Sequence, residues 1–531
     1  MKVILVLLLL LSEQCIAQQW SKVTTFGGKK TDAAYKVVHD KEGGIYIIGQ
    51  YSSSITIDTI TLVGSDQQNV YIAKYNRFNR VVWAQTYVAA VTGPANIADV
   101  YGLVAGPSGS IYICGSYIGH VMIDSIELPL KAPTGLYIAK ISSNGIHQWL
   151  KTPRGYGQGT FNQNIAFAIA LDSAEHCVVT GNYVDTVSFD TVTIASGHPR
   201  QTFLVQYDSS GNVLWARGSR GAGAIHAGLA VAVDRKGNTY LCGEFFYQIA
   251  FGSDTINAND AEQKIFLCKY DSAGRLLWSQ KVGTGGYYGF VQDITVDSAG
   301  NPYLIGRFRS TIDFGAFQRT HNKSVGVSYA TLIIKYNSDG AIQWATQTSG
   351  AEHSAGGYGI VVDDQQHCFV TGSFSGPTTF GDTILSMEKS NLYVAQLDDL
   401  GKFIWIKTVS GTGQSSGGPL TPMINGSLVV VGGFAGSVFF DDISITAESN
   451  DVFIATLSTK TDEVSENKHT EVVPFYPNPA HGIIHFTSIG THRVTDLLGR
   501  TLKQTTQAQM NVNNLASGSY YIDGKLVIVK N

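Results

Sequence analysis

The sequence has few charged residues and few prolines. Charged side chains make up 15% of the 531 residues, the formal net charge is -4, and only 13 residues are proline. The chain has no long run of Lys or Arg, so it lacks the concentrated positive charge with which proteins usually bind nucleic acids. We therefore do not expect nucleic acid as a partner.

Long hydrophobic runs are also scarce, and the clearest one lies at the start of the chain. Lys2 precedes an apolar stretch from Val3 to Leu11, and polar residues then lead to small residues at Cys15 and Ala17. The run is much shorter than the ~20 residues that a membrane-spanning helix needs, so no transmembrane segment is expected. The pattern is typical of a secretory signal peptide, residues 1–17, cleaved after Ala17.

Cysteine is another scarce residue, with six in the chain. Cleavage after Ala17 would remove Cys15 and leave an odd number, so an exported protein could not pair them all. The others alternate with Val, Ile and Thr, where Cys behaves as a small hydrophobe, and disulfides are not expected to hold the fold together. A lipoprotein signal would acylate Cys15, but it requires a small residue in place of Gln14 and an aliphatic one in place of Ser12.

Tryptophan is present seven times, and all seven copies stand in one register. They are Trp20, Trp83, Trp149, Trp215, Trp278, Trp344 and Trp405. Successive copies are 61 to 66 residues apart. Self-similarity at such a period indicates a repeat architecture.

Each period contains two predicted hairpins. LVQYDSSGNVLWARG (204–218) carries the tryptophan, and Asp208 with Gly211 at the fourth position is typical of a type I turn closed by a left-handed glycine. AVAVDRKGNTYLCGEF (230–245) is an example of the other hairpin. The stretch between the two, such as Thr311–Gly315, is predicted to be an extended crossing.

A glycine in the second hairpin also repeats seven times. Its positions are Gly49, Gly115, Gly181, Gly243, Gly306, Gly372 and either Gly432 or Gly433. Two hairpins give four strands, and a lone four-stranded sheet must cover both faces by stacking against neighbours. We predict an all-β fold: a seven-bladed β-propeller of four-stranded blades at residues 18–458, with the N-terminal strand around Trp20 closing the last blade. The units resemble the SBBP-type β-propeller repeats of bacterial exported proteins, and this resemblance implies a fold but not a function.

A second domain is predicted after a polar linker at residues 459–472. Residues 473–531 contain VPFYPNPAHG, VTDLLGRTL, NLASGSYYI and KLVIVKN in that order. Physically they fit a small Ig-like β-sandwich, with Asp523-Gly524 as a two-residue hairpin turn. The motifs resemble the type A C-terminal sorting domain of the type IX secretion system; the alternative is an ordinary Ig-like accessory module.

The resemblance of the tail implies an export route. The signal peptide would take the chain into the periplasm, and the type IX machinery would be its partner at the outer membrane, leaving the protein secreted or on the cell surface. The residues that match the sorting motifs are Pro477, Asn478, Pro479, Asp496, Leu497, Gly499, Arg500, Gly518, Tyr520 and Lys530.

Residues that break the repeat are the best candidates for a ligand site. They gather in the loops from each Trp strand to the next hairpin, which share one face of a propeller. The candidates are Arg154, Tyr156, Phe161, Arg220, His226, Tyr287, Tyr288, Glu352, His353 and Tyr358. Aromatic and Arg side chains around a concavity favour glycan or peptide recognition, whereas the alternative is ordinary glycine-rich connectors.

No motif of a metal site, nucleophile or phosphate loop is found, so no metal, cofactor or catalytic residue is predicted. Repeated aspartates such as Asp172 and Asp234 are turn formers. The leading hypothesis is therefore a surface binding or adhesion propeller for a glycan or protein ligand, without enzymatic activity. The alternatives are a structural surface scaffold and a carbohydrate-active enzyme with its site in the funnel.

Overall fold

The computed structural model divides the chain into two compact units, Met1–Thr461 and Asp462–Asn531. In the first unit it describes residues 18–90, 97–128, 134–155, 164–196, 200–222, 225–258, 261–285, 287–315, 317–321, 328–350 and 355–459. In the second it describes residues 475–476, 483–486, 492–495, 501–507, 509–522 and 525–529. The described residues form strands, turns and bends without a helix, so the prediction of an all-β fold is confirmed. No helix long and apolar enough to cross a membrane occurs in these ranges.

The described residues of the first unit form seven sets of four antiparallel strands. The first strands are β2 (Ala33–His39), β6 (Ile97–Ala105), β13 (Ile165–Leu171), β19 (Ala227–Val233), β25 (Tyr287–Val296), β30 (Ala355–Val362) and β34 (Gln414–Pro422). The second strands are β3 (Ile45–Ile57), β7 (Ile111–Ile118), β14 (Cys177–Tyr183), β20 (Thr239–Phe245), β26 (Pro302–Asp313), β31 (Cys368–Phe380) and β35 (Leu428–Phe440).

The third and fourth strands complete each set. The third strands are β4 (Ile60–Tyr75), β10 (Gly135–Ile141), β17 (Gln201–Tyr207), β23 (Lys264–Tyr270), β28 (Ala330–Tyr336), β32 (Thr383–Leu397) and β36 (Ile443–Ser458). The fourth strands are β5 (Val81–Ala90), β11 (His147–Lys151), β18 (Val213–Gly218), β24 (Leu276–Lys281), β29 (Ile342–Ser349), β33 (Phe403–Thr408) and, for the seventh set, β1 (Gln19–Phe26).

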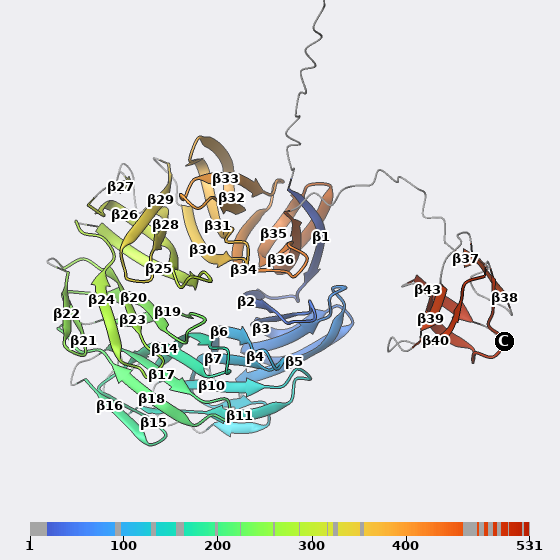
Figure 1. Ribbon diagram of the computed structural model, residues 1–531, viewed down its shortest axis with the longest axis horizontal. Helices are drawn as coiled ribbons and strands as arrows, with labels where there is room; N and C mark the ends of the chain where they lie inside the picture. Colours follow the sequence, from blue (N-terminus) through green and yellow to red (C-terminus); the bar gives the residue numbers. More distant parts are fainter. Residues whose placement is uncertain are drawn as a thin grey trace, which may run out of the picture. The chain divides into compact units, whose positions relative to one another are not determined.

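The seven sets follow one another around a common centre in chain order (Figure 1). Each first strand contacts the first strand of the next set, and β34 of the seventh set contacts β2 of the first. The N-terminal strand β1 pairs with β36, with Trp20 opposite Leu457. The two ends of the described range Gln18–Thr459 therefore meet in one sheet.

The hydrophobic core is divided into seven clusters, one between each pair of neighbouring sets. The cluster between the seventh and first sets, for example, joins Val431 and Ile454 to Ile45 and Ile47. Both faces of every sheet are covered in this way, because a β-sheet with two apolar faces is stable only when both are buried. Cys114, Cys177, Cys242, Cys268 and Cys368 are buried and unbridged, as the sequence predicts.

The tryptophans join each set to the next. The indole N–H of Trp83 donates to the backbone oxygen of Ser143 at 3.1 Å, and that of Trp149 to Ser209 at 3.2 Å. Trp215, Trp278 and Trp344 make the equivalent bond to the turn of the following set. In these five copies the indole therefore lies between neighbouring sets.

The turns between first and second strands and between third and fourth strands lie at one end of each set, which we call the turn end. The N–H of Gly211 donates to the oxygen of Asp208 at 2.9 Å, and Gly211 has a φ of 87°. The predicted turn with a left-handed glycine is therefore confirmed. The opposite end, where the first strands begin, is called the loop end.

The predicted extended crossings are wrong, because these stretches are hairpins at the loop end. β3 and β4 keep pairing to Ile57 opposite Ile60, and β21 (Gln248–Phe251) pairs with β22 (Asp254–Asn257). The physical reason is a turn residue with positive φ, such as Asp58 at 53°, since Asp tolerates the left-handed conformation that a tight hairpin requires. Similar hairpins are β8 (Val121–Ile123) with β9 (Ile126–Leu128), β15 (Thr186–Phe189) with β16 (Val192–Ala195), and β27 (Gln318–His321) with β26.

These hairpins link neighbouring sets through their backbones. The pairs at the seven junctions are Gly27 with Thr56, Val88 with Ile123, Arg154 with Ser188, Arg220 with Ala250, Thr284 with Asp313, Thr348 with Phe380, and Ser410 with Phe439. The link from Gly27 continues the chain of β1 into the first set. Each sheet edge is therefore partly covered at the loop end.

The described residues of the second unit form two sheets. One is β37 (Phe475–Tyr476), β38 (Ile483–Phe486) and β41 (Gln509–Asn511); the other is β40 (Thr501–Thr505), β39 (His492–Thr495), β42 (Gly518–Ile522) and β43 (Lys525–Val529). Ile484, Val494 and Met510 form a shared buried cluster. Ile522 is opposite Lys525, so the predicted two-residue connection between the last strands is confirmed.

Candidate functional site

Each first strand carries one extra residue near the loop end, which makes a β-bulge against the second strand. The register shifts lie between Ala34 and Lys36, Val100 and Gly102, Ala166 and Ala168, Gly228 and Ala230, Val291 and Asp293, Gly357 and Gly359, and Gly417 and Leu420. In every set the residue before the shift is opposite the repeated glycine, which is Gly432 in the last set.

The bulge explains why the glycine repeats. A Cβ on any of these seven glycines would lie 1.8 to 2.2 Å from a carbonyl oxygen of the first strand. The oxygen belongs to Asp99 for Gly115 and to Phe290 for Gly306. The glycine is therefore required by the close approach of two backbones rather than by its φ angle.

The bulged residues surround a cavity of about 980 Å³ at the centre of the ring. Four of the bulged side chains are aromatic: Tyr35, Tyr101, Phe167 and Tyr358. The equivalent residues of the other sets are Leu229, Gln292, and Gly418 with Pro419, and all of them line the cavity. A bulge re-aims a side chain that a regular strand would direct between the sheets, so the repeat itself builds an aromatic rim.

The cavity wall beyond the rim is formed by small and charged residues. Gly102, Ala168 and Ala230 follow the bulge in three sets, and Lys36 and Asp293 follow it in two others. Burial raises the pKa of Asp293, and the charge of Lys36 opposes this effect. The carboxylate also accepts the N–H of Ile294 at 3.0 Å.

A polar network joins the first and second sets at the rim. The hydroxyl of Tyr35 donates to Oε1 of Gln50 at 2.7 Å, and Nε2 of Gln50 donates to Oδ1 of Asp99 at 2.8 Å. The ring of Tyr101 lies 5.3 Å from that of Phe167. Burial and the charge of Asp99 raise the pKa of Tyr101, so its hydroxyl stays protonated and can serve as a hydrogen-bond donor.

A second carboxyl that lines the cavity is Glu244, in β20 of the fourth set. Its carboxylate accepts a hydrogen bond from Nε2 of Gln263. Burial raises the pKa of Glu244 to about 7, although the charges of Arg200 and Arg307 act in the opposite direction. The carboxyl therefore titrates near neutral pH.

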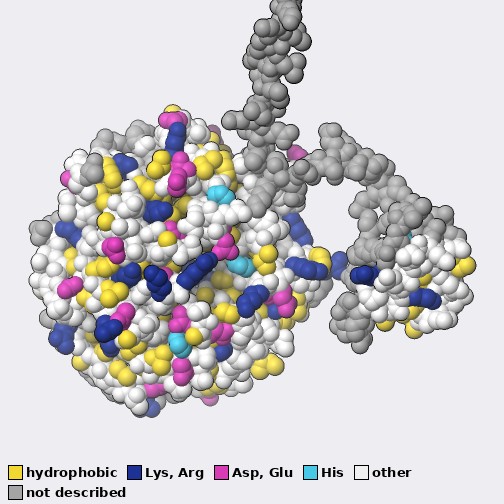
Figure 2. All heavy atoms as spheres, in the orientation of Figure 1, with side chains coloured by type: hydrophobic (Ala, Val, Ile, Leu, Met, Phe, Trp, Pro, Cys, Tyr) yellow, Lys and Arg dark blue, Asp and Glu magenta, His cyan; other side chains and the backbone are white. Residues whose placement is uncertain are grey.

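Arg307 lies between two aromatic rings beside Glu244. Its guanidinium carbon is 4.7 Å from the ring centre of Phe290 and 5.0 Å from that of Tyr329. Arg309 also lies over Tyr329, at 5.9 Å. Figure 2 shows Lys and Arg side chains near the middle of one face of the ring, with Asp and Glu side chains among them.

A third carboxyl, Asp32, lies where the ring closes. It is 1% exposed, lines the cavity, and accepts the N–H of Gly28 at 2.5 Å. Burial raises its pKa to about 7; the bond from Gly28 lowers it, and the neighbouring Asp451 raises it further. The other oxygen of Asp32, Oδ1, is buried without a hydrogen-bond partner among the described residues.

The structure separates the candidate residues that the sequence suggests. Tyr358 lines the cavity, and its hydroxyl accepts a bond from Ser373 at 3.3 Å. Arg154, in β12 (Arg154–Gly155), and Arg220 lie at the junctions between sets and do not line the cavity. His226 is fully buried, with its ring nitrogens 3.1 Å from Oε1 of Gln201 and 3.2 Å from the oxygen of Phe246.

The remaining candidates cannot be assigned contacts. The backbone of Tyr287 and Tyr288 is in β25, but their side chains are not described. Tyr156, Phe161, Glu352 and His353 lie outside the described residues. Of the sorting-motif residues, Gly518 and Tyr520 lie in β42, and the hydroxyl of Tyr520 donates to the oxygen of Ala516 at 2.8 Å. Pro477, Asn478, Pro479, Asp496, Leu497, Gly499, Arg500 and Lys530 lie outside the described residues.

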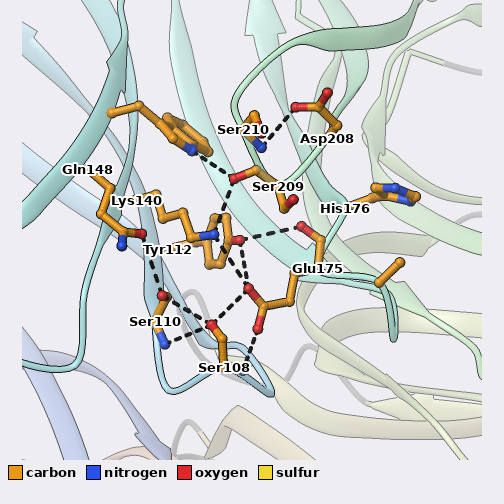
Figure 3. Close-up of polar contacts among 12 residues, drawn as sticks. Ser108, Ser110, Tyr112, Lys140, Gln148, Glu175, His176, Asp208, Ser209 and Ser210 are labelled. Carbon is orange, nitrogen blue, oxygen red and sulfur yellow. Dashed lines mark hydrogen bonds and ion pairs between the residues drawn. The ribbon is translucent and has the colours of Figure 1, made fainter.

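A polar cluster away from the cavity lies at the turn end (Figure 3). Glu175 occupies the turn position that glycine takes in other sets, with a φ of 60°. Its carboxylate accepts bonds from the N–H of Ser108 at 2.5 Å, the hydroxyl of Tyr112 at 3.1 Å and Nζ of Lys140 at 3.5 Å. These bonds join two neighbouring sets, which is a structural role. Among the described residues no group of three or more His, Cys, Asp or Glu is placed to hold a metal ion.

Three comparisons place the chain among known proteins. Residues 474–525 match the family described as a secretion system C-terminal sorting domain. An uncharacterized WD repeat-containing protein of Acanthamoeba polyphaga mimivirus is 22% identical over 503 residues, which cover 77% of this chain and 35% of that protein. The chain thus spans about a third of the length of that relative.

The solved structures with a similar fold are distant in sequence. A protein of unknown function from Dyadobacter fermentans is 9% identical, with 83% of this chain and 99% of that chain covered and a TM-score of 0.42. An ulvan lyase bound to -[GlcA(1-4)Rha3S]- is 11% identical, with 77% and 93% covered and a TM-score of 0.43. A Hadza microbial sialidase is 12% identical, with 73% of each chain covered and a TM-score of 0.33. These neighbours are propeller-like proteins.

The sorting-domain match and the similar solved structures bear on two expectations, the localisation of the protein and its lack of enzymatic activity. The sorting domain indicates export by the type IX secretion system to the cell surface or the medium, so the predicted localisation is confirmed. The expectation that the chain is not an enzyme is corrected, because the similar solved structures include a lyase, sialidases and a glucose dehydrogenase. An enzymatic activity of this chain is not shown by that likeness.

Proposed function

We propose that this protein is a seven-bladed β-propeller of SBBP-type repeats, exported with a signal peptide and an Ig-like sorting domain, that binds a glycan in its central cavity. The observation that carries the proposal is the bulge in all seven first strands, which directs Tyr35, Tyr101, Phe167 and Tyr358 to one cavity. The domain boundaries at residues 17, 458 and 473 belong to the same proposal.

The size and polarity of the cavity favour a glycan over a protein partner. A volume of about 980 Å³ is in the range of small-ligand sites, whereas a stable protein interface needs ~800 Å² on each partner. Tyr35, which lines the cavity, belongs to a hydrogen-bond network of donors and acceptors with Gln50 and Asp99. Sugar hydroxyls both donate and accept hydrogen bonds, so they match such a network.

The test is a glycan array with the purified full chain, followed by calorimetry on the strongest glycan. Tyr101→Ala removes a cavity ring that packs against Phe167, and we expect it to weaken binding by about tenfold or more, as for aromatic anchors at other sites. Phe78→Ala is the matched control, since Phe78 is 63% exposed and lies at the turn end.

The outcomes of this test are distinct. Binding that Tyr101→Ala weakens and Phe78→Ala leaves unchanged supports the proposal. Absence of any glycan binding overturns it, and selective binding of a peptide or protein in a parallel array would transfer the site to the protein-ligand hypothesis. Equal loss in both variants would also overturn the assignment to the cavity.

One observation favours a second function, acid–base catalysis on a bound glycan. Burial raises the pKa of Glu244 to about 7, and a carboxyl that titrates near neutral pH is suited to transfer a proton. Glu244→Gln should abolish release of new chain ends from the polysaccharides selected by the array, while the exposed Glu42→Gln at the turn end should not. Activity that survives Glu244→Gln would exclude Glu244 as the acid.

A further inference from the structure

Arg307 lies between two aromatic rings, and the N–H at its Nε has no protein acceptor among the described residues. Phe290 and Tyr329 lie on Arg307 at 4.7 and 5.0 Å from its guanidinium carbon. Its Nε atom is buried and has no hydrogen-bond partner among the described residues. A buried donor without an acceptor costs about 1 to 3 kcal/mol, so this edge of the guanidinium gains free energy when an acceptor arrives.

The surroundings of Arg307 are rich in positive charge. Arg309 lies over the same Tyr329 ring at 5.9 Å. Arg200 approaches Glu244 from the third set, where burial lowers the pKa of Arg200 and Glu244 opposes the effect. The one carboxyl in this group, Glu244, accepts a bond from Gln263. The guanidinium groups of Arg200 and Arg307 therefore both act on the carboxyl of Glu244, which lines the cavity together with Phe290.

We propose that Arg307, with Arg200, forms an anion subsite that binds the carboxylate or sulfate of an acidic sugar. The proposal rests on the glycan-binding function above and names its ligand class. Because a guanidinium presents its donors in one plane, it bonds two oxygens of such a group at once. Because Phe290 and Tyr329 cover the two faces of the Arg307 guanidinium, a ligand would approach this group in its plane.

Glu244 makes the subsite sensitive to pH. Its pKa is raised to about 7, so below pH 7 the carboxyl is neutral and the arginines attract the ligand. Above pH 7 the ionised carboxylate competes with the ligand for the same cations. The charged groups that act on Glu244 are Arg200 and Arg307, and neither loses its charge in this range.

The experiment compares acidic and neutral glycans on the full chain. The array contains uronate oligosaccharides, their methyl esters, sulfated oligosaccharides and their desulfated forms. We expect the anionic member of a pair to bind more tightly. Arg307→Gln should weaken that binding by about 10- to 100-fold, as for a hydrogen bond to a charged group, while its affinity for neutral glycans stays unchanged. Arg235→Gln is the control, because Arg235 is 71% exposed and pairs with Asp364.

The pH profile provides a second readout that does not depend on the stability of the Arg307 variant. Binding of the anionic glycan should weaken between pH 6 and pH 8, and Glu244→Gln should remove that dependence. The uronate and sulfate arms of the array identify which anion is bound.

The results that would overturn the subsite differ from those that would overturn glycan binding. Binding of neutral glycans with equal affinity, unaffected by Arg307→Gln, overturns the anion subsite and leaves the propeller as a glycan binder. Absence of binding to every glycan overturns the proposed function itself. If Arg307→Gln fails to fold, Arg307→Lys takes its place, because lysine keeps the positive charge but cannot donate two parallel hydrogen bonds. Arg307→Lys should bind the anion less tightly than wild type. Equal affinity would overturn the proposal.

Discussion

The two ends of the same sheets differ in how their charged side chains are satisfied. At the turn end, Asp208 accepts bonds from the N–H groups of Ser210 and Asn212 at 2.9 and 2.8 Å, and Glu175 is held by Ser108, Tyr112 and Lys140. At the loop end, Oδ1 of Asp32 and Nε of Arg307 are buried without partners among the described residues.

The repeat shows the same difference in its sequence. The turn end repeats an aspartate or asparagine at most of its turns, because every copy must make the same fold; Gly106, Ser142 and Met423 stand there in the other three. At the loop end, the residue after the repeated glycine changes from set to set. It is Gln50, Ser116, Asn182, Glu244, Arg307, Ser373 and Gly433. We infer that the turn end maintains the ring and that the loop end carries the binding chemistry, in line with the role of loops in other folds.

The largest expected effect concerns the close backbone approach at the bulges. In Gly432→Ala the new Cβ would lie 2.2 Å from the oxygen of Ser416, whereas in Gly433→Ala the nearest atom is 3.6 Å away. We expect Gly432→Ala to lose about 4 kcal/mol or more of unfolding free energy, or not to fold, and Gly433→Ala to change it by less than about 0.5 kcal/mol. Urea unfolding followed by Trp fluorescence measures both.

Because both variants replace a glycine by an alanine, comparing Gly432→Ala with Gly433→Ala controls for the change in backbone entropy of the unfolded chain. Similar stability of the two alanine variants would contradict the bulge geometry and the explanation of the repeated glycine.

An intermediate effect is expected at the turn end. Lys140 bonds Glu175 and the oxygen of Ser209 at 3.1 Å, with both side chains of the ion pair nearly buried. Lys140→Met should cost about 2 to 3 kcal/mol, because it leaves a buried carboxylate without its cation. Arg275→Met, which breaks an ion pair whose Arg is 80% exposed, should cost less than about 0.5 kcal/mol.

The acid dependence of the Lys140 variant gives a further check. Burial acts to raise the pKa of Glu175, but the bonds from Ser108, Tyr112 and Lys140 hold it below its ordinary value. The stability from these bonds is present above the ordinary pKa and is lost as the pH falls. The difference between wild type and Lys140→Met should therefore shrink in acid; a difference that grows in acid would contradict this account.

The smallest effect is expected from Asp32 at the loop end. Its pKa is raised to about 7, so the folded state holds a proton that the unfolded state releases above about pH 4. Stability should therefore fall as the pH rises from 4 to 7. Asp32→Asn should be more stable than wild type at pH 8 by about 1 kcal/mol or more, the equivalent of one pKa unit, and nearly equal at pH 4. Thermal unfolding at the two pH values measures this, and a variant that is less stable at pH 8 would refute it.

Much of the fold was predictable because the repeat is strong. The register of the tryptophans gives the sets, and the Asp208 turn has the predicted left-handed glycine. The loop-end hairpins were missed although Asp58 and Asp190, both with positive φ, are turn residues between apolar runs. A period-two pattern over so few residues does not distinguish a hairpin from a single extended strand.

The site was less predictable. A bulge shifts the register by one residue, and a sequence does not reveal a register before the partner strand is known. Tyr35 and Tyr101 therefore remained unnoticed, whereas Tyr358 was found from its glycine-rich loop. Glu244 and Arg307 are 63 residues apart and both follow the repeated glycine, so aligning that one position across the repeats would have brought them together.

Whether the central cavity is the ligand site is tested most directly by a crystal structure of the full chain with the glycan that the array selects. We predict electron density for the glycan inside the rim formed by Tyr35, Tyr101 and Tyr358, with an anionic group at Arg307. Density for the glycan at the turn end or on the outer strands, with the central cavity empty, would contradict the account.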